Sequence, residues 1–249
     1  MDQIRRSCFG KLFEIPLARC SNSGKLLHQL ITRQLVTRKK YELWMVFGGH
    51  PLKFSLAEFA QITGLPCGDI PKDVGNKIEK TPDATWREII GESADTTLTQ
   101  ICNLLEDKKT RESMSDDRKL KLALILIVDG VLIANLQHPT TKPTPRYVTM
   151  LSDLQNFLQY PWGRESCLIT IDSLRPALQP VKKKDDPIKK FRARLFDGSV
   201  VLKGFPIALQ LLAFKNIPKL LEWLPSIRGP HSLGYLSRHC SITHASQRE

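Results

Sequence analysis

The sequence lacks any apolar run long enough to cross a membrane. Its longest run, Leu122–Ala134, follows Lys119 and Lys121 and is interrupted by Asp129. A bilayer-spanning helix needs about 20 nearly uninterrupted apolar residues, so a buried core helix is expected here instead. The first six residues, Met1–Arg6, also lack the apolar core and small-residue cleavage site of a signal peptide. Together these absences predict an intracellular protein without a membrane partner.

Closely spaced cysteines are also absent. Six cysteines are present, but no two of them form a C-x-x-C pair, which excludes a zinc ribbon and a thioredoxin-type redox motif. His231, His239, Cys240 and His244 are of zinc-ligand types, yet only one of them is a cysteine. We therefore expect an exposed tail there and no metal site. Isolated, reduced thiols are typical of the cytosol or nucleus.

No catalytic motif is complete. Gly24-Lys25 resembles the end of a phosphate-binding loop, but Leu26 replaces the Ser or Thr that would hold magnesium. Cys67-Gly68 could form a nucleophile site with His50 and Asp69, which leaves a cryptic cysteine hydrolase open as an alternative. The sequence otherwise predicts a non-enzyme without a cofactor or small-molecule substrate.

Aromatic residues make up only 7% of the chain and do not alternate with Lys or Arg, so no base-stacking platform is visible. Basic residues are abundant, because 37 Lys and Arg against 25 Asp and Glu give a net charge of +12. Such a balance attracts phosphates or acidic protein surfaces. The densest basic segment, 182–194, is interpreted as a solvated loop or as a nucleic-acid or nuclear-import contact. Its candidate residues are Lys182, Lys183, Lys184, Lys189, Lys190, Arg192 and Arg194.

Helical spacing of apolar residues dominates the rest of the chain. It predicts helices near residues 23–38, 55–63, 86–90, 98–105, 116–132, 148–158 and 206–223. Ser23 is placed to cap the first of these, and Ser55 with Glu58 fits a capping box. The segment that begins at Asp116 is apolar nearly all round, so we expect it to be the central helix.

Strands are few. Residues 41–47 and 52–54 flank Gly48-Gly49, which can adopt the positive φ angles of a hairpin turn. Residues 168–178 are expected to hold a strand and a short helix, and residues 200–202 a brief strand. Trp44 and Trp162 are expected in the core. The predicted fold is mainly α and compact, with a small β-hairpin near residues 41–54 and one or two further short strands.

The domain organisation follows from composition. A hydrophobic fraction of 41% with 25% charged residues is ordinary for a folded protein. We expect one helix-rich domain over residues 1–225, followed by a polar, flexible tail over residues 226–249.

Several segments resemble the plant domain of unknown function number nineteen eighty-five. They extend over roughly residues 7–223. These segments are Ser7–Gly10, Arg38–Trp44, Phe54–Ala60, Thr63–Gly68, Leu120–Leu126, Phe157–Leu158, Tyr160–Gly163 and Lys203–Phe214.

The resemblance implies a context rather than an activity. In that family the domain commonly lies upstream of a SUMO-protease-like cysteine peptidase, in proteins thought to descend from Mutator-like transposable elements. The present sequence lacks the Asp-Cys-Gly and Trp-bearing histidine segments of that peptidase. The expected function is therefore a protein-interaction or scaffolding module that acts in the nucleus, or otherwise in the cytoplasm. Nucleic-acid binding through segment 182–194 is the alternative.

Overall fold

The computed structural model describes residues 2–15, 23–71, 84–133, 140–177, 186–198, 200–217 and 219–222. The chain forms two compact units, each built from two separate stretches. Unit 1 contains residues 1–14 and 64–166, and unit 2 contains residues 15–63 and 167–249. The predicted fold class is confirmed, since helices dominate and a small antiparallel sheet is present. The expectation that residues 1–225 act as a single domain stays a prediction.

The elements described in unit 1 are all helices. Its elements are α1 (Asp2–Arg5), η1 (Gly10–Glu14), α4 (Ala84–Ile89), α5 (Leu98–Glu106), α6 (Lys108–Ser113), α7 (Asp116–Ile125), η4 (Leu126–Leu132), α8 (Pro145–Met150) and α9 (Leu154–Gln159). α10 (Trp162–Leu174) begins in unit 1 and ends in unit 2. None of the described helices is long and apolar enough to span a membrane.

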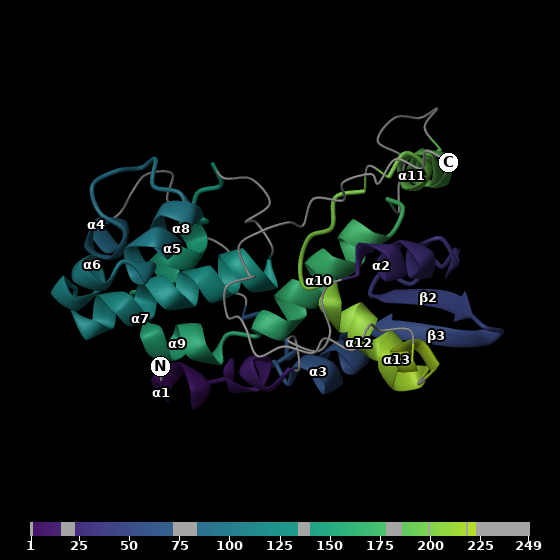
Figure 1. Ribbon diagram of the computed structural model, residues 1–249, viewed down its shortest axis with the longest axis horizontal. Coiled ribbons are helices and arrows are strands. Elements are labelled where there is room, and N and C mark those ends of the chain that lie inside the picture. Colours follow the sequence, from purple (N-terminus) through teal and green to yellow (C-terminus); the bar gives the residue numbers. More distant parts are fainter. Residues whose placement is uncertain are drawn as a thin grey trace. The chain divides into compact units, whose positions relative to one another are not determined.

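The predicted central helix is confirmed as α7 and its continuation. Ser115 caps α7 by accepting a hydrogen bond from the Arg118 backbone N–H at 3.3 Å. Two aspartates in the first turn complement the positive end of the helix dipole. The helix continues as the π-helical segment η4, and α4 and α5 pack on it (Figure 1). Helices that pack on several sides explain why the segment from Asp116 to Leu132 is apolar nearly all round.

Unit 2 is built on a three-stranded antiparallel sheet. Its strands are β1 (Gln34–Leu35), β2 (Glu42–Phe47) and β3 (His50–Ser55), in the order β1-β2-β3. Gly48 and Gly49 form the hairpin turn with φ angles of 57° and 81°, as predicted. These positive values favour glycine, because a side chain would meet the backbone in this region. β1 was not predicted, because residues 34–35 lie within the helix expected over residues 23–38.

Three helices pack on this sheet: α2 (Gly24–Ile31), α3 (Leu56–Thr63) and α12 (Ile207–Asn216). Unit 2 also contains the second half of α10, α11 (Pro187–Phe196) and α13 (Lys219–Glu222). α3 and α12 pack on β3, and α2 packs on β2 (Figure 1). Phe54 and Phe59 meet edge to face with centroids 6.1 Å apart, and Phe59 meets Phe205 at 6.5 Å. Such pairs add stability beyond the area that they bury.

Two strand predictions were wrong. Residues 168–174 belong to α10, where Cys167, Ile171 and Leu174 are buried at helical spacing. Burial along one helix face outweighed the β-branched composition of this segment. Residues 200–202 lie outside any strand.

Two local details also differ from expectation. α2 ends at Ile31 rather than near residue 38, because the next residues pair with β2 as β1. The Ser55 hydroxyl donates directly to the Glu58 carboxylate instead of forming the reciprocal backbone bonds of a capping box. A complete capping box is found at Thr97 and Gln100, at the start of α5.

Candidate interaction surfaces

The predicted basic segment is partly helical. Lys182, Lys183 and Lys184 lie outside the described residues, whereas Lys189, Lys190, Arg192 and Arg194 all lie on α11. Asp186 caps this helix by accepting hydrogen bonds from two backbone N–H groups at 2.9 and 3.1 Å. The four basic residues are exposed, as the sequence indicated, but the helix replaces the loop that was expected there. Their role in binding stays a prediction.

α11 is anchored in unit 2 through one face. Phe191 and Leu195 are buried four residues apart, and the Leu195 carbonyl contacts the His28 ring Nε2 at 3.0 Å. Arg194 lies over the Phe191 ring, with its guanidinium carbon 5.4 Å from the centroid. These contacts fix which side of the helix faces outward.

The outward side of α11 combines charge with an aromatic ring. Lys189, Arg192 and Phe196 are spaced three and seven residues apart, which places them on the same face of an α-helix. All three are exposed, and Phe196 has 91% of its surface accessible. Basic and aromatic residues do not alternate along the sequence, and helical geometry is what brings these three together.

The outer face of the sheet carries several apolar side chains beside Glu42 and Lys53. Leu35 lies opposite Trp44, and Val46 lies opposite Pro51, so these four side chains share the face turned away from the core. Leu35 is 46% exposed, and Val36 next to it is 74% exposed. We call these five residues the sheet patch. Trp44, which was expected in the core, is only partly buried, whereas Trp162 is fully buried as predicted.

Charged groups border the sheet patch. The Trp44 indole donates a hydrogen bond to Glu42 at 2.8 Å, and Lys39 pairs with the same carboxylate at 3.3 Å. The hydrogen bond from Trp44 and the nearby Lys39 lower the pKa of Glu42. Lys53 pairs with Glu58 at 3.3 Å. An apolar centre with a polar border is the usual composition of a protein interface.

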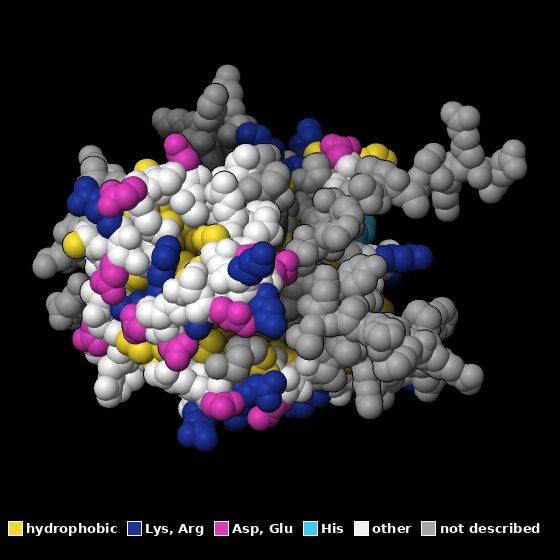
Figure 2. Space-filling model, turned by 60° about the vertical axis from the view of Figure 1, so that its left-hand side comes forward, with side chains coloured by type: hydrophobic (Ala, Val, Ile, Leu, Met, Phe, Trp, Pro, Cys, Tyr) yellow, Lys and Arg dark blue, Asp and Glu magenta, His cyan; other side chains and the backbone are white. Residues whose placement is uncertain are grey.

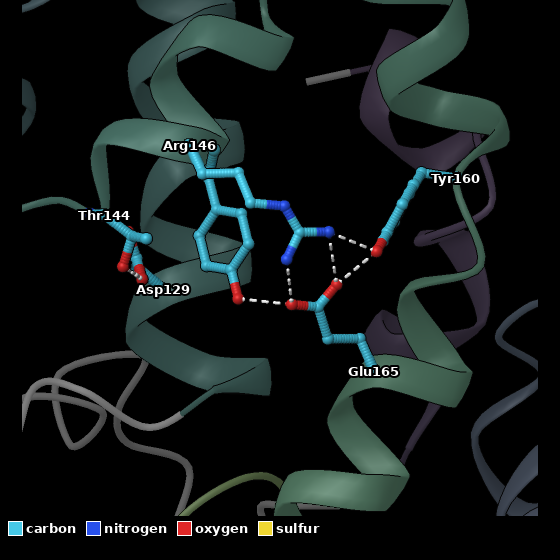
Figure 3. A network of polar contacts seen from close by, with 6 residues as sticks. Asp129, Thr144, Arg146, Tyr160 and Glu165 are labelled. Atoms are coloured by element: carbon cyan, nitrogen blue, oxygen red, sulfur yellow. Dashed lines mark hydrogen bonds and ion pairs between the residues drawn. The ribbon is translucent and has the colours of Figure 1, made fainter. Parts of the chain in front are cut away.

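A buried polar network forms the densest group of titratable side chains in unit 1 (Figure 3). The Glu165 carboxylate accepts hydrogen bonds from Tyr147 at 2.7 Å and Tyr160 at 2.5 Å. Arg146 donates to the same two oxygens at 3.1 and 3.3 Å and to the Tyr160 hydroxyl at 2.5 Å. The Trp162 ring packs against both tyrosine rings, with centroids 5.3 and 4.5 Å away.

The electrostatics of this network favour a structural role. Burial and the charge of Glu165 raise the pKa of both Tyr147 and Tyr160. Each hydroxyl therefore stays protonated and donates a hydrogen bond to the carboxylate. Burial works to lower the pKa of Arg146, but Glu165 and the tyrosines outweigh it and raise that pKa. Each carboxylate oxygen of Glu165 thus accepts two hydrogen bonds within the protein. The network links the starts of α8 and α10.

A second buried carboxylate supports the same region. Asp129 is fully buried in η4 and accepts hydrogen bonds from the Thr144 backbone N–H and hydroxyl, both at 2.7 Å (Figure 3). This contact fixes the residue that precedes Pro145 at the start of α8. Neither cluster was predicted from the sequence. The sequence offered one signal for the first cluster, the segment Tyr160–Gly163 that resembles the family. That segment does not indicate that Arg146 and Tyr147 are its partners.

The candidate cysteine site has no support from local chemistry. Burial raises the pKa of Cys67 to about 11, so its thiol is protonated at neutral pH. Asp69 pairs with Arg164 at 2.8 Å, and the Arg164 side chain also donates to the Cys67 carbonyl at 3.2 Å. The segment after Cys67 is therefore held by Arg164.

The remaining candidates are metal ligands and a surface depression. Within the described ranges, no three His, Cys, Asp or Glu side chains converge as metal ligands would. His231, His239, Cys240 and His244 lie outside those ranges. Unit 1 has an open depression of about 540 Å³ beside α5, but its carboxylates have partners. Asp95 pairs with Lys142 at 2.7 Å, and Asp107 caps α6.

Charge on the surface is mixed where it can be seen. Figure 2 shows Lys and Arg side chains interspersed with Asp and Glu over the described part of one face. The positive net charge is not concentrated on this face. α11 and the sheet patch, both in unit 2, are the two candidate interaction surfaces.

Comparison with known families decides the affiliation of the chain. The family described as Domain of unknown function (DUF1985) matches residues 31–173. The chain belongs to this family. The DUF1985 match is narrower than the resemblance quoted from the sequence, because Ser7–Gly10 and Lys203–Phe214 lie outside it. It covers β1 to β3, α3 and the buried network of unit 1. No curated protein and no solved structure matches the chain significantly.

Proposed function

We propose that this DUF1985 protein is a non-catalytic protein-interaction module that binds its partner through the sheet patch. The observation that carries the proposal is the exposed apolar surface formed by Leu35, Val36, Trp44, Val46 and Pro51. Single exposed apolar side chains are ordinary on a monomer, whereas a group of them such as Leu35, Trp44, Val46 and Pro51 on one sheet face is typical of an interaction site. The polar border around Glu42 and Lys53 fits the rim of such a site.

The cellular setting is part of the same proposal. The family resemblance supports a plant nuclear protein derived from a Mutator-like transposable element and associated with a SUMO-protease-like peptidase. A fluorescent fusion expressed in plant cells tests the location, and exclusion from the nucleus would contradict it.

Affinity capture from plant nuclear extract tests the binding proposal. The bait is the full chain, compared with a Leu35→Lys/Val46→Lys variant that places charge in the sheet patch. Ile70→Lys is the matched control, because Ile70 is also exposed but lies in unit 1. We expect the wild type and the control to retain a partner that the double variant loses, and the purified partner to bind directly. Equal capture by all three proteins would refute the proposal.

A second candidate function is nucleic-acid binding through the basic segment 182–194. It is favoured by the exposed Lys189, Lys190, Arg192 and Arg194 on α11. Phosphate contacts release counterions, so binding should weaken steeply as salt increases. Titration of labelled nucleic acid at two salt concentrations tests this candidate, and lack of binding at low salt would exclude it.

A further inference from the structure

We propose that α11 binds single-stranded nucleic acid, with Lys189 and Arg192 on the phosphates and Phe196 stacked on a base. This inference rests on the second candidate function above and specifies its ligand. The juxtaposition that carries it is one helix face that holds two exposed cations and the most exposed large apolar side chain described in the chain.

Phe196 is the feature that distinguishes this helix from an ordinary solvated basic segment. With 91% of its surface exposed, its ring has both faces available to a ligand. The ring sits in the last turn of a capped helix whose other face is buried through Phe191 and Leu195. An aromatic ring on a rigid support gives a base a stacking platform, and every base has a π-face to offer.

The spacing of the three side chains suits a short stretch of one strand. At about 1.5 Å rise per residue, Lys189 and Phe196 are separated by about 10 Å along the helix axis. A strand with unstacked bases is longer than the roughly 3.4 Å per nucleotide of a stacked one, so this distance corresponds to at most about three nucleotides. Arg192 lies between them on the same face and can hold an intervening phosphate. Asp186 and Asp197 flank the helix and disfavour phosphates beyond its two ends.

Duplex and membrane ligands fit this face less well. In a duplex the bases are already stacked on each other, so an exposed ring finds polar base edges rather than a free π-face. A helix that lies on a membrane needs an apolar face to insert, but the apolar face of α11 is buried within unit 2. The charges favour an anionic ligand, and the ring selects one with unstacked bases.

Fluorescence anisotropy with the full chain tests the inference. The probes are a labelled single-stranded oligothymidine, the same length of duplex, and vesicles of anionic lipid, each at low and moderate salt. The key variant is Phe196→Ala. Ile188→Ala is its matched control, because Ile188 is a second exposed apolar side chain on α11. Lys189→Gln/Arg192→Gln tests the phosphate contacts.

We expect Phe196→Ala to weaken single-strand binding roughly 5- to 150-fold while Ile188→Ala leaves it unchanged. The double Gln variant should reduce the slope of log affinity against log salt by about 1.4 for the single strand. Binding that is unaffected by Phe196→Ala, or is as tight to duplex, would overturn the single-strand inference but keep nucleic-acid binding. Failure to bind either nucleic acid would overturn both, and binding to vesicles alone would assign the helix to a membrane surface.

Discussion

Removal of the Glu165 carboxylate should destabilise the protein far more than removal of an exposed glutamate. Glu165 accepts two hydrogen bonds from Arg146 and one each from Tyr147 and Tyr160, and its side chain is only 11% exposed. In Glu165→Ala, the Arg146 charge and two hydroxyl groups lose their common partner. Breaking a buried ion pair from one side typically costs about 3–5 kcal/mol. Partial exposure of Arg146 favours the lower end of this range.

Urea unfolding followed by circular dichroism measures this loss. With a dependence of about 2 kcal/mol per M of urea, a cost of about 3 kcal/mol lowers the midpoint by about 1.5 M. Glu88→Ala is the matched control, because Glu88 pairs with Lys121 at 3.2 Å but is 65% exposed. Exposed pairs contribute about 0–1 kcal/mol, so the control should remain near the wild-type midpoint.

A third variant separates the cost of an unpaired charge from a general loss of packing. Arg146→Met/Glu165→Met removes both charges, and replacing both partners by apolar groups is often close to neutral. We expect this double variant to be more stable than Glu165→Ala, although the tyrosine hydroxyls still lose their acceptor. If Glu165→Ala and Glu88→Ala had the same midpoint, or if the double variant were the least stable, the structural role of the network would be refuted.

Three further predictions also concern unit 1. Gly163→Ala should destabilise the protein by about 1–3 kcal/mol in thermal or urea unfolding, because a Cβ there would lie 2.6 Å from the Cys67 Sγ and 2.8 Å from the Pro66 carbonyl oxygen. Gly68→Ala is the control and should leave stability unchanged, because a Cβ at Gly68 meets nothing within 4 Å. Tyr147 and Tyr160 should resist ionisation in a spectroscopic titration, and since their pKa is raised, stability should be full below pH about 10 and fall above it as unfolded tyrosines ionise. The Cys67 thiol, with a pKa of about 11, should react with a disulfide reagent at pH 8 much more slowly in the folded protein than in urea; equal rates would contradict its burial.

The test at Gly163 is informative because two effects oppose each other. Alanine is favoured over glycine in a helix by about 1 kcal/mol, so helix propensity alone predicts stabilisation. The Gly163 backbone N–H donates to the Pro66 carbonyl at 2.9 Å, which holds the two segments too close for a side chain. A stabilised Gly163→Ala variant would show that this contact is loose in solution.

Several elements could be predicted because their signals are local. The turn at Gly48-Gly49 needs positive φ angles, and alternating burial along 42–47 follows from the two-residue period of a strand. Ser23 caps α2 as predicted, through a backbone group only three residues away. The family affiliation also follows from the sequence, since it rests on the order of residues and not on their positions in space.

Other features depended on contacts between distant residues. Residues 168–174 are rich in strand-forming side chains, yet the core accepts Ile171 and Leu174 only at helical spacing. Trp44 and Trp162 look alike in sequence, but Trp162 is enclosed by three aromatic rings while Trp44 lies on the outer face of the sheet. Burial of this kind is set by what packs on each side chain, and a single sequence does not contain that information.

The basic segment shows where the two sources of information meet. The sequence alone determined that Lys189 and Arg192 belong to an exposed, positively charged segment, because charged side chains avoid the core when unpaired. Only the tertiary structure decided that they lie on one face with Phe196, since burial of Phe191 and Leu195 fixes the rotation of α11. In the same way, the sequence supplied Arg146 and Glu165, and the folding of unit 1 made them partners. Turns, helix caps and charged segments depend on neighbouring residues, so the sequence determines them. Surfaces and buried pairs join distant residues, so they depend on packing.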